Sequence, residues 1–108
     1  AGFDFEKNVL TVVLPQVSKD ASYVNTKWEM QKEPFKGDVI NSYNDGPLAD
    51  GTQMGPFYEI ESSSPALALK KGEAASYTQT TCHFTGDHSL LKQLAEQLLH
   101  INIDELKK

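Results

Sequence analysis

Cysteine is nearly absent from this sequence, and basic residues are scarce. The single cysteine, Cys82, excludes an intrachain disulfide and a cysteine-rich zinc site, and we expect it to be a small buried residue in a strand. The chain has 10 lysines and arginines against 15 aspartates and glutamates, which gives a net charge of -5. Such a chain has no positively charged surface for nucleic acid or for an anionic membrane, so we expect neither as a partner.

Long apolar runs and metal-binding patterns are also missing. No stretch approaches the roughly 20 apolar residues that span a bilayer. The three histidines, His83, His88 and His100, have no metal-ligand spacing, and no phosphate loop or dinucleotide-binding fingerprint is present. We therefore predict no metal and no cofactor. With 108 residues, the chain has enough length for one domain with one modest core.

Alternation of apolar and polar residues predicts short strands along most of the chain. We expect strands at 3–5, 9–14, 23–31, 39–43, 57–62 and 76–84. A tight turn at Asn8 joins the first two. In the third strand, Val24, Trp28 and Met30 share a face that should point inward, so a core position is the simplest reading of Trp28.

The period of the pattern changes after the last strand. Leucines at helical spacing predict one α-helix over about 87–101, with Asp87 as N-cap and Asn102 in the left-handed position that ends it. Many short strands followed by one helix favour an all-β, mainly antiparallel fold of the β-sandwich type with a C-terminal helix. We expect residues 1–108 to form a single domain of this kind.

Two glutamates form the strongest candidate for chemistry. In the strand at 57–62, Glu59 and Glu61 share one face, and Tyr58 and Ile60 share the other. Side chains two apart on a strand lie roughly 6.5–7 Å apart, close to the roughly 6.5–9.5 Å between the carboxyls of inverting glycosidases, although those come from different elements. A solvated strand face is the simpler alternative. Phe57, on the same face, favours a site in which a carboxylate acts as acid or base.

Other polar and aromatic residues suit a sugar-binding surface. Aromatic rings can stack on the apolar faces of sugars, while amides and acids bind hydroxyl groups. The candidates for substrate contact are Phe57, Tyr43, Asn44, Asp45, Tyr77 and His83. For Asn44 and Asp45, a role in forming the turn with Gly46 is the alternative.

A family resemblance appears in residues 55–84, GPFYEIESSSPALALKKGEAASYTQTTCHF. Gly-Pro-Phe, a glutamate-bearing strand, a proline, a Leu-x-x-Gly-Glu turn and a threonine-rich strand ending in Phe follow one another. This order resembles the C-terminal part of the galactose-mutarotase (aldose 1-epimerase) superfamily. Together with KGDVINSYNDGP at 36–47, it is most similar to an uncharacterised bacterial group of that superfamily, and the likeness spans the whole chain.

The resemblance implies a sandwich-type fold and a role for one glutamate. In the superfamily, a strand glutamate is the general base that removes the proton from the anomeric hydroxyl; Glu59 is the favoured match and Glu61 the alternative. Lys71 stands where the superfamily turn usually has proline, and the superfamily's catalytic histidine lies upstream of the matched segment. Complete mutarotases are much longer, so the resemblance implies the C-terminal portion of a longer protein, or a shortened relative.

Three functions follow as hypotheses. The first is carbohydrate processing in the parent protein, with Glu59 or Glu61 as base. The second is a non-catalytic carbohydrate-binding module. The third is a structural domain that forms a homodimer through an exposed sheet edge, because unpaired edges accept further strands. The sequence does not fix the compartment, although the bacterial likeness suits a periplasmic or secreted location.

Overall fold

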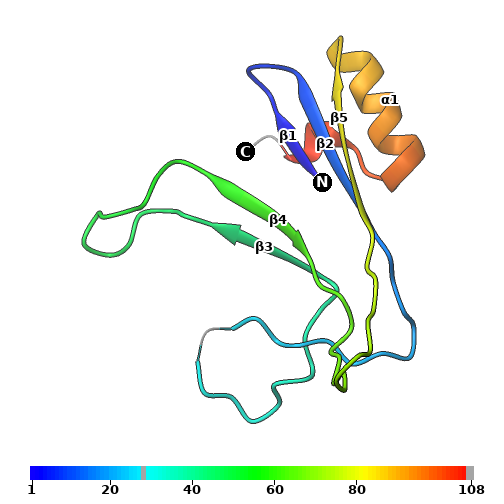
Figure 1. Ribbon diagram of the computed structural model, residues 1–108. Helices are drawn as coiled ribbons and strands as arrows, with labels where there is room; N and C mark the ends of the chain where they lie inside the picture. The colour runs from blue at the N-terminus through cyan, green and yellow to red at the C-terminus, as the bar shows by residue number, and fades with distance from the viewer. Residues whose placement is uncertain (28, 107–108) are drawn as a thin grey trace. The chain divides into compact units, whose positions relative to one another are not determined.

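The chain is a β-rich fold with one helix near its C-terminus (Figure 1). The computed structural model describes residues 1–27 and 29–106. Its elements are β1 (Gly2–Asp4), β2 (Val9–Pro15), β3 (Ile40–Asn44), β4 (Tyr58–Ser62), β5 (Gln79–Thr85), α1 (His88–Leu99) and the 3-10 turn η1 (Ile103–Leu106). The strands form two mainly antiparallel sheets, β1-β2-β5 and β3-β4, which confirms the predicted fold class.

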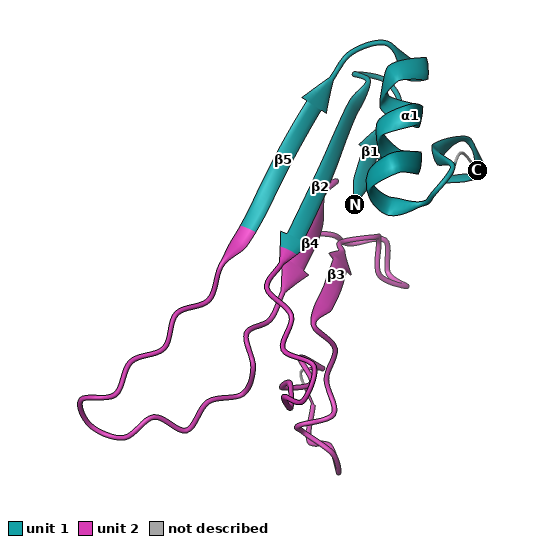
Figure 2. Cartoon of the chain, turned by 90° about the vertical axis from the view of Figure 1, so that its right-hand side faces the viewer, with its two compact units in different colours: residues 1–14, 80–108 teal, residues 15–79 magenta. Residues whose placement is uncertain are grey.

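The chain divides into two compact units (Figure 2). Unit 1 consists of residues 1–14 and 80–108, and unit 2 of residues 15–79. The three-stranded sheet and the helix belong mainly to unit 1, and the β3-β4 hairpin belongs to unit 2. That residues 1–108 are one domain of a longer protein stays a prediction.

Unit 1 begins with a tight hairpin. β1 pairs antiparallel with β2, and Phe3 lies opposite Leu10. The turn between them requires the left-handed backbone of Asn8, with φ of 51°, and the Asp4 carboxylate accepts the amide of Glu6 at 2.9 Å. Asparagine tolerates this conformation better than most residues, so the predicted turn at Asn8 is confirmed.

The hydrophobic core lies between β2 and α1. Alternation places Leu10 and Val12 on the same side of β2, where they meet Leu91 and Ala95 of the helix and Ile103 of η1. Each of these five side chains is at most 1% exposed. Burying one leucine of this kind contributes about 1.5–3 kcal/mol. Cys82, expected to be a small buried residue in a strand, lies in β5 and is half-buried against this cluster.

The helix lies within two residues of its predicted bounds, but it ends differently. Asp87 occupies the N-cap position with extended backbone, although its side chain makes no capping hydrogen bond. The left-handed residue is His100, with φ of 56°, and its N–H donates to the carbonyl of Glu96 at 3.1 Å. Asn102 was expected in this role; instead its side chain accepts the Asp104 amide at 3.1 Å, at the start of η1. The chain turns at residue 100, which lets Ile103 reach the core.

The predicted strand at 23–31 is wrong. Among the described residues of this segment, only Tyr23 makes a bridge, to Lys36, and Val24 and Met30, which should point inward, are 45% and 100% exposed. Alternation marks the two sides of a segment but does not supply a hydrogen-bonding neighbour. Here the Asn25 N–H donates to the carbonyl of Pro34 at 2.8 Å, within a loop. Trp28, expected in the core, lies outside the described residues.

No helix among the described residues has the length and apolar character needed to cross a membrane.

Candidate functional site

The β3-β4 hairpin brings four polar side chains onto one face. In its antiparallel register, Tyr43 lies opposite Glu59 and Asn41 lies opposite Glu61. Residues directly opposite in an antiparallel pair project to the same side. We call these four residues, Asn41, Tyr43, Glu59 and Glu61, the glutamate face. The prediction that both glutamates share one strand face is therefore confirmed.

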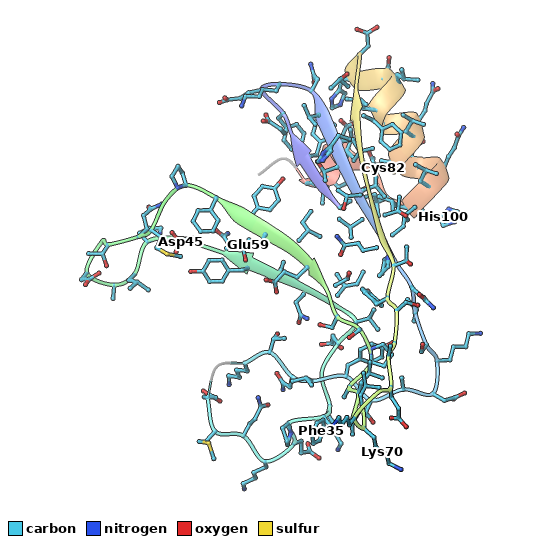
Figure 3. All side chains as sticks on the ribbon, in the orientation of Figure 1. Phe35, Asp45, Glu59, Lys70, Cys82 and His100 are labelled. Atoms are coloured by element: carbon cyan, nitrogen blue, oxygen red, sulfur yellow. The ribbon has the colours of Figure 1, made fainter. Side chains whose placement is uncertain are left out.

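The glutamate face forms one wall of an open groove of about 660 Å³. This volume lies in the range of about 300–1,000 Å³ that is typical of small-molecule sites. Both glutamates are exposed to solvent. The groove is lined by Thr26, Asn41, Ser42, Tyr43, Met54, Glu59 and Glu61. Figure 3 shows Glu59 on the hairpin, with Asp45 at the end of the neighbouring strand.

Asp45 stabilises the end of the hairpin through two hydrogen bonds. Its side chain is 8% exposed, one carboxylate oxygen accepts the Tyr43 hydroxyl at 2.7 Å, and the other accepts the Gly55 N–H at 2.7 Å. The hydrogen bond from Tyr43, followed by that from Gly55, lowers the pKa of Asp45. Asp45 is thus a buried anion that holds the loop at 45–55 closed and fixes Tyr43.

The Tyr43 side chain is held in place by a hydrogen bond, so it offers an aromatic surface but is poorly suited to donate its proton. Its hydrogen bond to Asp45, above all, raises the pKa of the phenol, and the charge of Glu59 adds to this effect. Its ring lies 6.0 Å from that of Phe57, tilted by 37°. The two rings are 42% and 38% exposed, so each retains apolar surface on which a ligand could stack.

Of the six predicted contact residues, only Tyr43 belongs to the glutamate face; Asp45 and Phe57 contact Tyr43, and the other three lie elsewhere. Asn44 pairs with Tyr58 and projects from the opposite side of the hairpin. Tyr77, predicted within the last strand, precedes β5 and lines a different cavity of about 200 Å³. His83 lies on β5 in unit 1, where its Nδ1 is 3.0 Å from the Thr11 hydroxyl oxygen. Their roles in substrate binding stay predictions.

Sequence reasoning missed four residues that line the groove, Thr26, Asn41, Ser42 and Met54. Asn41 could have been found, because it lies two residues before Tyr43 and so shares its strand face. Thr26 lies in the segment whose alternation wrongly predicted a strand, and Met54 lies in a loop without periodicity, so no sequence pattern could place either at the groove.

The carboxylates and amide of the groove can accept hydrogen bonds from a ligand. The described lining holds no histidine, lysine or arginine, so it contains no cationic side chain. Its two carboxylates are suited to bind hydroxyl groups, and one could act as a base. The Tyr43 proton is held by Asp45, so it is a poor source of an acid. Among the described residues, no three His, Cys, Asp or Glu side chains lie close enough to share a metal ion.

Comparison with known proteins identifies a family for this chain but does not identify an activity. A family model described as a family of unknown function (DUF6786) matches residues 1–108, the whole chain. No curated protein and no solved structure matches the sequence.

Proposed function

We propose that this chain, which belongs to the DUF6786 family of unknown function, binds carbohydrate in the groove on the β3-β4 hairpin. The observation that carries the proposal is the glutamate face, where Glu59 and Glu61 stand opposite Tyr43 and Asn41. Carboxylate and amide oxygens accept hydrogen bonds from sugar hydroxyls, and the amide N–H₂ donates one. The exposed Tyr43 ring offers a flat apolar surface for the face of a sugar ring.

The groove favours an uncharged sugar over a phosphorylated or carboxylated one. Glu59 and Glu61 both face solvent in it, and its described lining contains no cation that could offset an added negative charge. An anionic group near 4–6 Å from either carboxylate would meet repulsion.

Proton abstraction by Glu59 is the catalytic form of this proposal. It rests on the likeness of residues 55–84 to the C-terminal part of mutarotases. Glu59 is preferred to Glu61 because Glu59 lies directly opposite Tyr43, so a sugar stacked on that ring would place its hydroxyls nearest Glu59. Anomer interconversion also needs an acid for the ring oxygen, and the described lining of the groove offers none. We therefore propose binding for this chain, and catalysis only where a longer protein adds that acid.

Binding is tested by NMR titration of the chain with glucose, galactose, xylose and their β-linked disaccharides. We expect chemical shift changes at Asn41, Tyr43, Glu59 and Glu61. The variant Tyr43→Ala should lose them. Tyr58→Ala is the matched control, because Tyr58 is an exposed tyrosine on the opposite side of the same hairpin and should leave binding unchanged. Equal losses in both variants, or no response to any sugar, would contradict the proposal.

The catalytic form is tested by following the conversion of α-glucose and α-galactose to equilibrium, in this chain and in any longer protein that contains it. Glu59→Gln keeps the size of the side chain and one acceptor oxygen but removes the base, so it should reduce the rate to that of buffer. Glu61→Gln should have the smaller effect. Glu6→Gln, an exposed glutamate in unit 1, is the control. Unchanged rates in both groove variants would exclude a glutamate base while leaving sugar binding intact.

A further inference from the structure

The β3-β4 hairpin is a two-stranded sheet with both outer edges unpaired within the described part of the chain. Isolated two-stranded hairpins are marginally stable in water, and unpaired edges recruit further strands. Unit 2 has little else to stabilise the hairpin, because Tyr23 is its one buried apolar side chain among the described residues. An added strand would therefore stabilise the hairpin more than any other part of unit 2.

The hydrogen bonds of the hairpin identify the groups that remain available at its edges. Ser63 N–H donates to Val39 O at 2.8 Å, and Asp45 N–H donates to Phe57 O at 3.2 Å. Antiparallel pairs alternate between bonded and non-bonded positions, so the odd-numbered residues of β3 direct their backbone groups toward β4. The backbone N–H and C=O groups of Ile40, Ser42 and Asn44 consequently point to the outer edge of β3.

The two outer edges differ sharply in charge. If two copies of β4 paired antiparallel with full overlap, Ile60 would lie opposite Ile60, and each Glu59 would lie opposite the other copy's Glu61. Like charges directly opposite are destabilising. The sequence of β3, Ile-Asn-Ser-Tyr-Asn, has no charged residue. Its full self-overlap places Ser42 opposite Ser42, which brings together the outward backbone groups that the edge leaves available.

We propose that the outer edge of β3 pairs antiparallel with the same edge of a second copy of this chain, forming a four-stranded sheet β4-β3-β3-β4. Ser42 lies at the two-fold axis, and Ile40 of each copy lies opposite Asn44 of the other. Asn41 of each copy then lies opposite Tyr43 of the other, on the glutamate face. The pairing extends each groove with a polar side chain from the second copy. It does not depend on what the groove binds.

Sedimentation velocity of the full chain over a concentration series tests the pairing. Because only short strands join, we expect a weak dimer with a dissociation constant between about 1 µM and 1 mM. Ser42→Pro removes an outward N–H of β3 and should abolish the dimer. Ile60→Pro is the matched control: it removes an outward N–H of β4, so the dimer should persist. The amide shifts of Tyr43 and Glu59 report whether each hairpin remains formed.

A charge exchange tests the register itself. Ser42→Lys and Ser42→Glu should each be monomeric, because like charges would face each other across the axis. An equimolar mixture of the two should form a heterodimer. A wild-type chain that stays monomeric at about 1 mM would overturn the proposal. So would a dimer that survives Ser42→Pro but is lost with Ile60→Pro, or a mixture of charged variants that stays monomeric.

Discussion

Unit 1 and unit 2 are stabilised in different ways. Unit 1 has a hydrophobic core in which Leu10, Leu91 and Ile103 are at most 1% exposed. In unit 2, the described residues include only two buried side chains, Tyr23 at 6% and Asp45 at 8% exposure. The first unit is held by packing and the second mainly by hydrogen bonds, which include the β3-β4 ladder and the bonds that Asp45 accepts from Tyr43 and Gly55.

This difference places the candidate chemistry on the less stabilised unit. The glutamate face and its groove belong entirely to residues 15–79. Binding surfaces are often drawn from regions with few apolar contacts, because those regions can adjust to a ligand. Ligand or a second copy would then supply stabilisation that the unit 2 core does not.

The largest expected effect is on unit 1. Leu91→Ala removes a side chain that is 0% exposed in the centre of the core. It should lower the free energy of unfolding of unit 1 by about 2–5 kcal/mol, measured by urea denaturation followed by helical circular dichroism. Leu90→Ala, the matched control on the same helix, is 50% exposed and should cost about 0.5 kcal/mol. Equal losses would contradict a core centred on Leu91.

The next effect should be confined to unit 2. Asp45→Ala removes the acceptor of both the Tyr43 hydroxyl and the Gly55 N–H, which leaves two donors unpaired at the hairpin end. Amide hydrogen exchange should become faster in β3 and β4, while the amides of α1 keep their protection. Asp50→Ala is a control in the same loop, where the carboxylate serves only Thr52 in the described structure. If Asp45→Ala left exchange in β3 and β4 unchanged, its hydrogen bonds would not be what holds the hairpin.

The stability of the hairpin end should also depend on pH, with an acid limit set by Asp45 and an alkaline limit set by Tyr43. The pKa of Asp45 is lowered from its ordinary value of 3.8 by hydrogen bonds from Tyr43 and Gly55. This stabilisation is therefore complete above about pH 3.8 and is lost as pH falls through the lower pKa of the folded state. The pKa of Tyr43 is raised above 10.0 by its bond to Asp45, so its contribution is complete below pH 10.0 and is lost at higher pH.

NMR titration of the Gly55 amide measures both limits of this window. The alkaline limit should disappear in Tyr43→Phe, which cannot ionise, while an acid limit remains through the Gly55 hydrogen bond to Asp45. If the alkaline transition were unchanged in Tyr43→Phe, the transition would have to come from a group other than Tyr43.

The smallest effect should come from the charged cluster on unit 1. Lys92 Nζ lies 2.6 Å and His88 Nε2 lies 2.7 Å from the two oxygens of Asp104, in an exposed setting. Lys92→Met should lower the thermal midpoint slightly at low salt and not measurably at about 1 M salt, because exposed ion pairs are screened. A loss comparable to that of Leu91→Ala would mean that unit 1 depends on this cluster rather than on its core.

Local patterns predicted much of the fold because local physics decides it. The apolar run at 9–14, the Tyr-Glu-Ile-Glu alternation at 58–61 and the leucine spacing of the helix each became the expected element. The segment at 23–31 has an equally clear alternation, yet the described part of it contains no regular strand. A strand requires a hydrogen-bonding neighbour, and the order of residues within one segment does not reveal whether a neighbour is there.

For the candidate site, the sequence alone determined that Glu59 and Glu61 share a side, because successive strand residues alternate between two faces. Only the tertiary structure decided which residues stand beside them. The register of β3 against β4 put Tyr43 and Asn41 opposite the glutamates and turned Asn44 away. The loop at 45–55 buried Asp45 and brought Met54 to the groove. Neighbours across a sheet or a loop depend on contacts between distant parts of the chain, and no local periodicity encodes them.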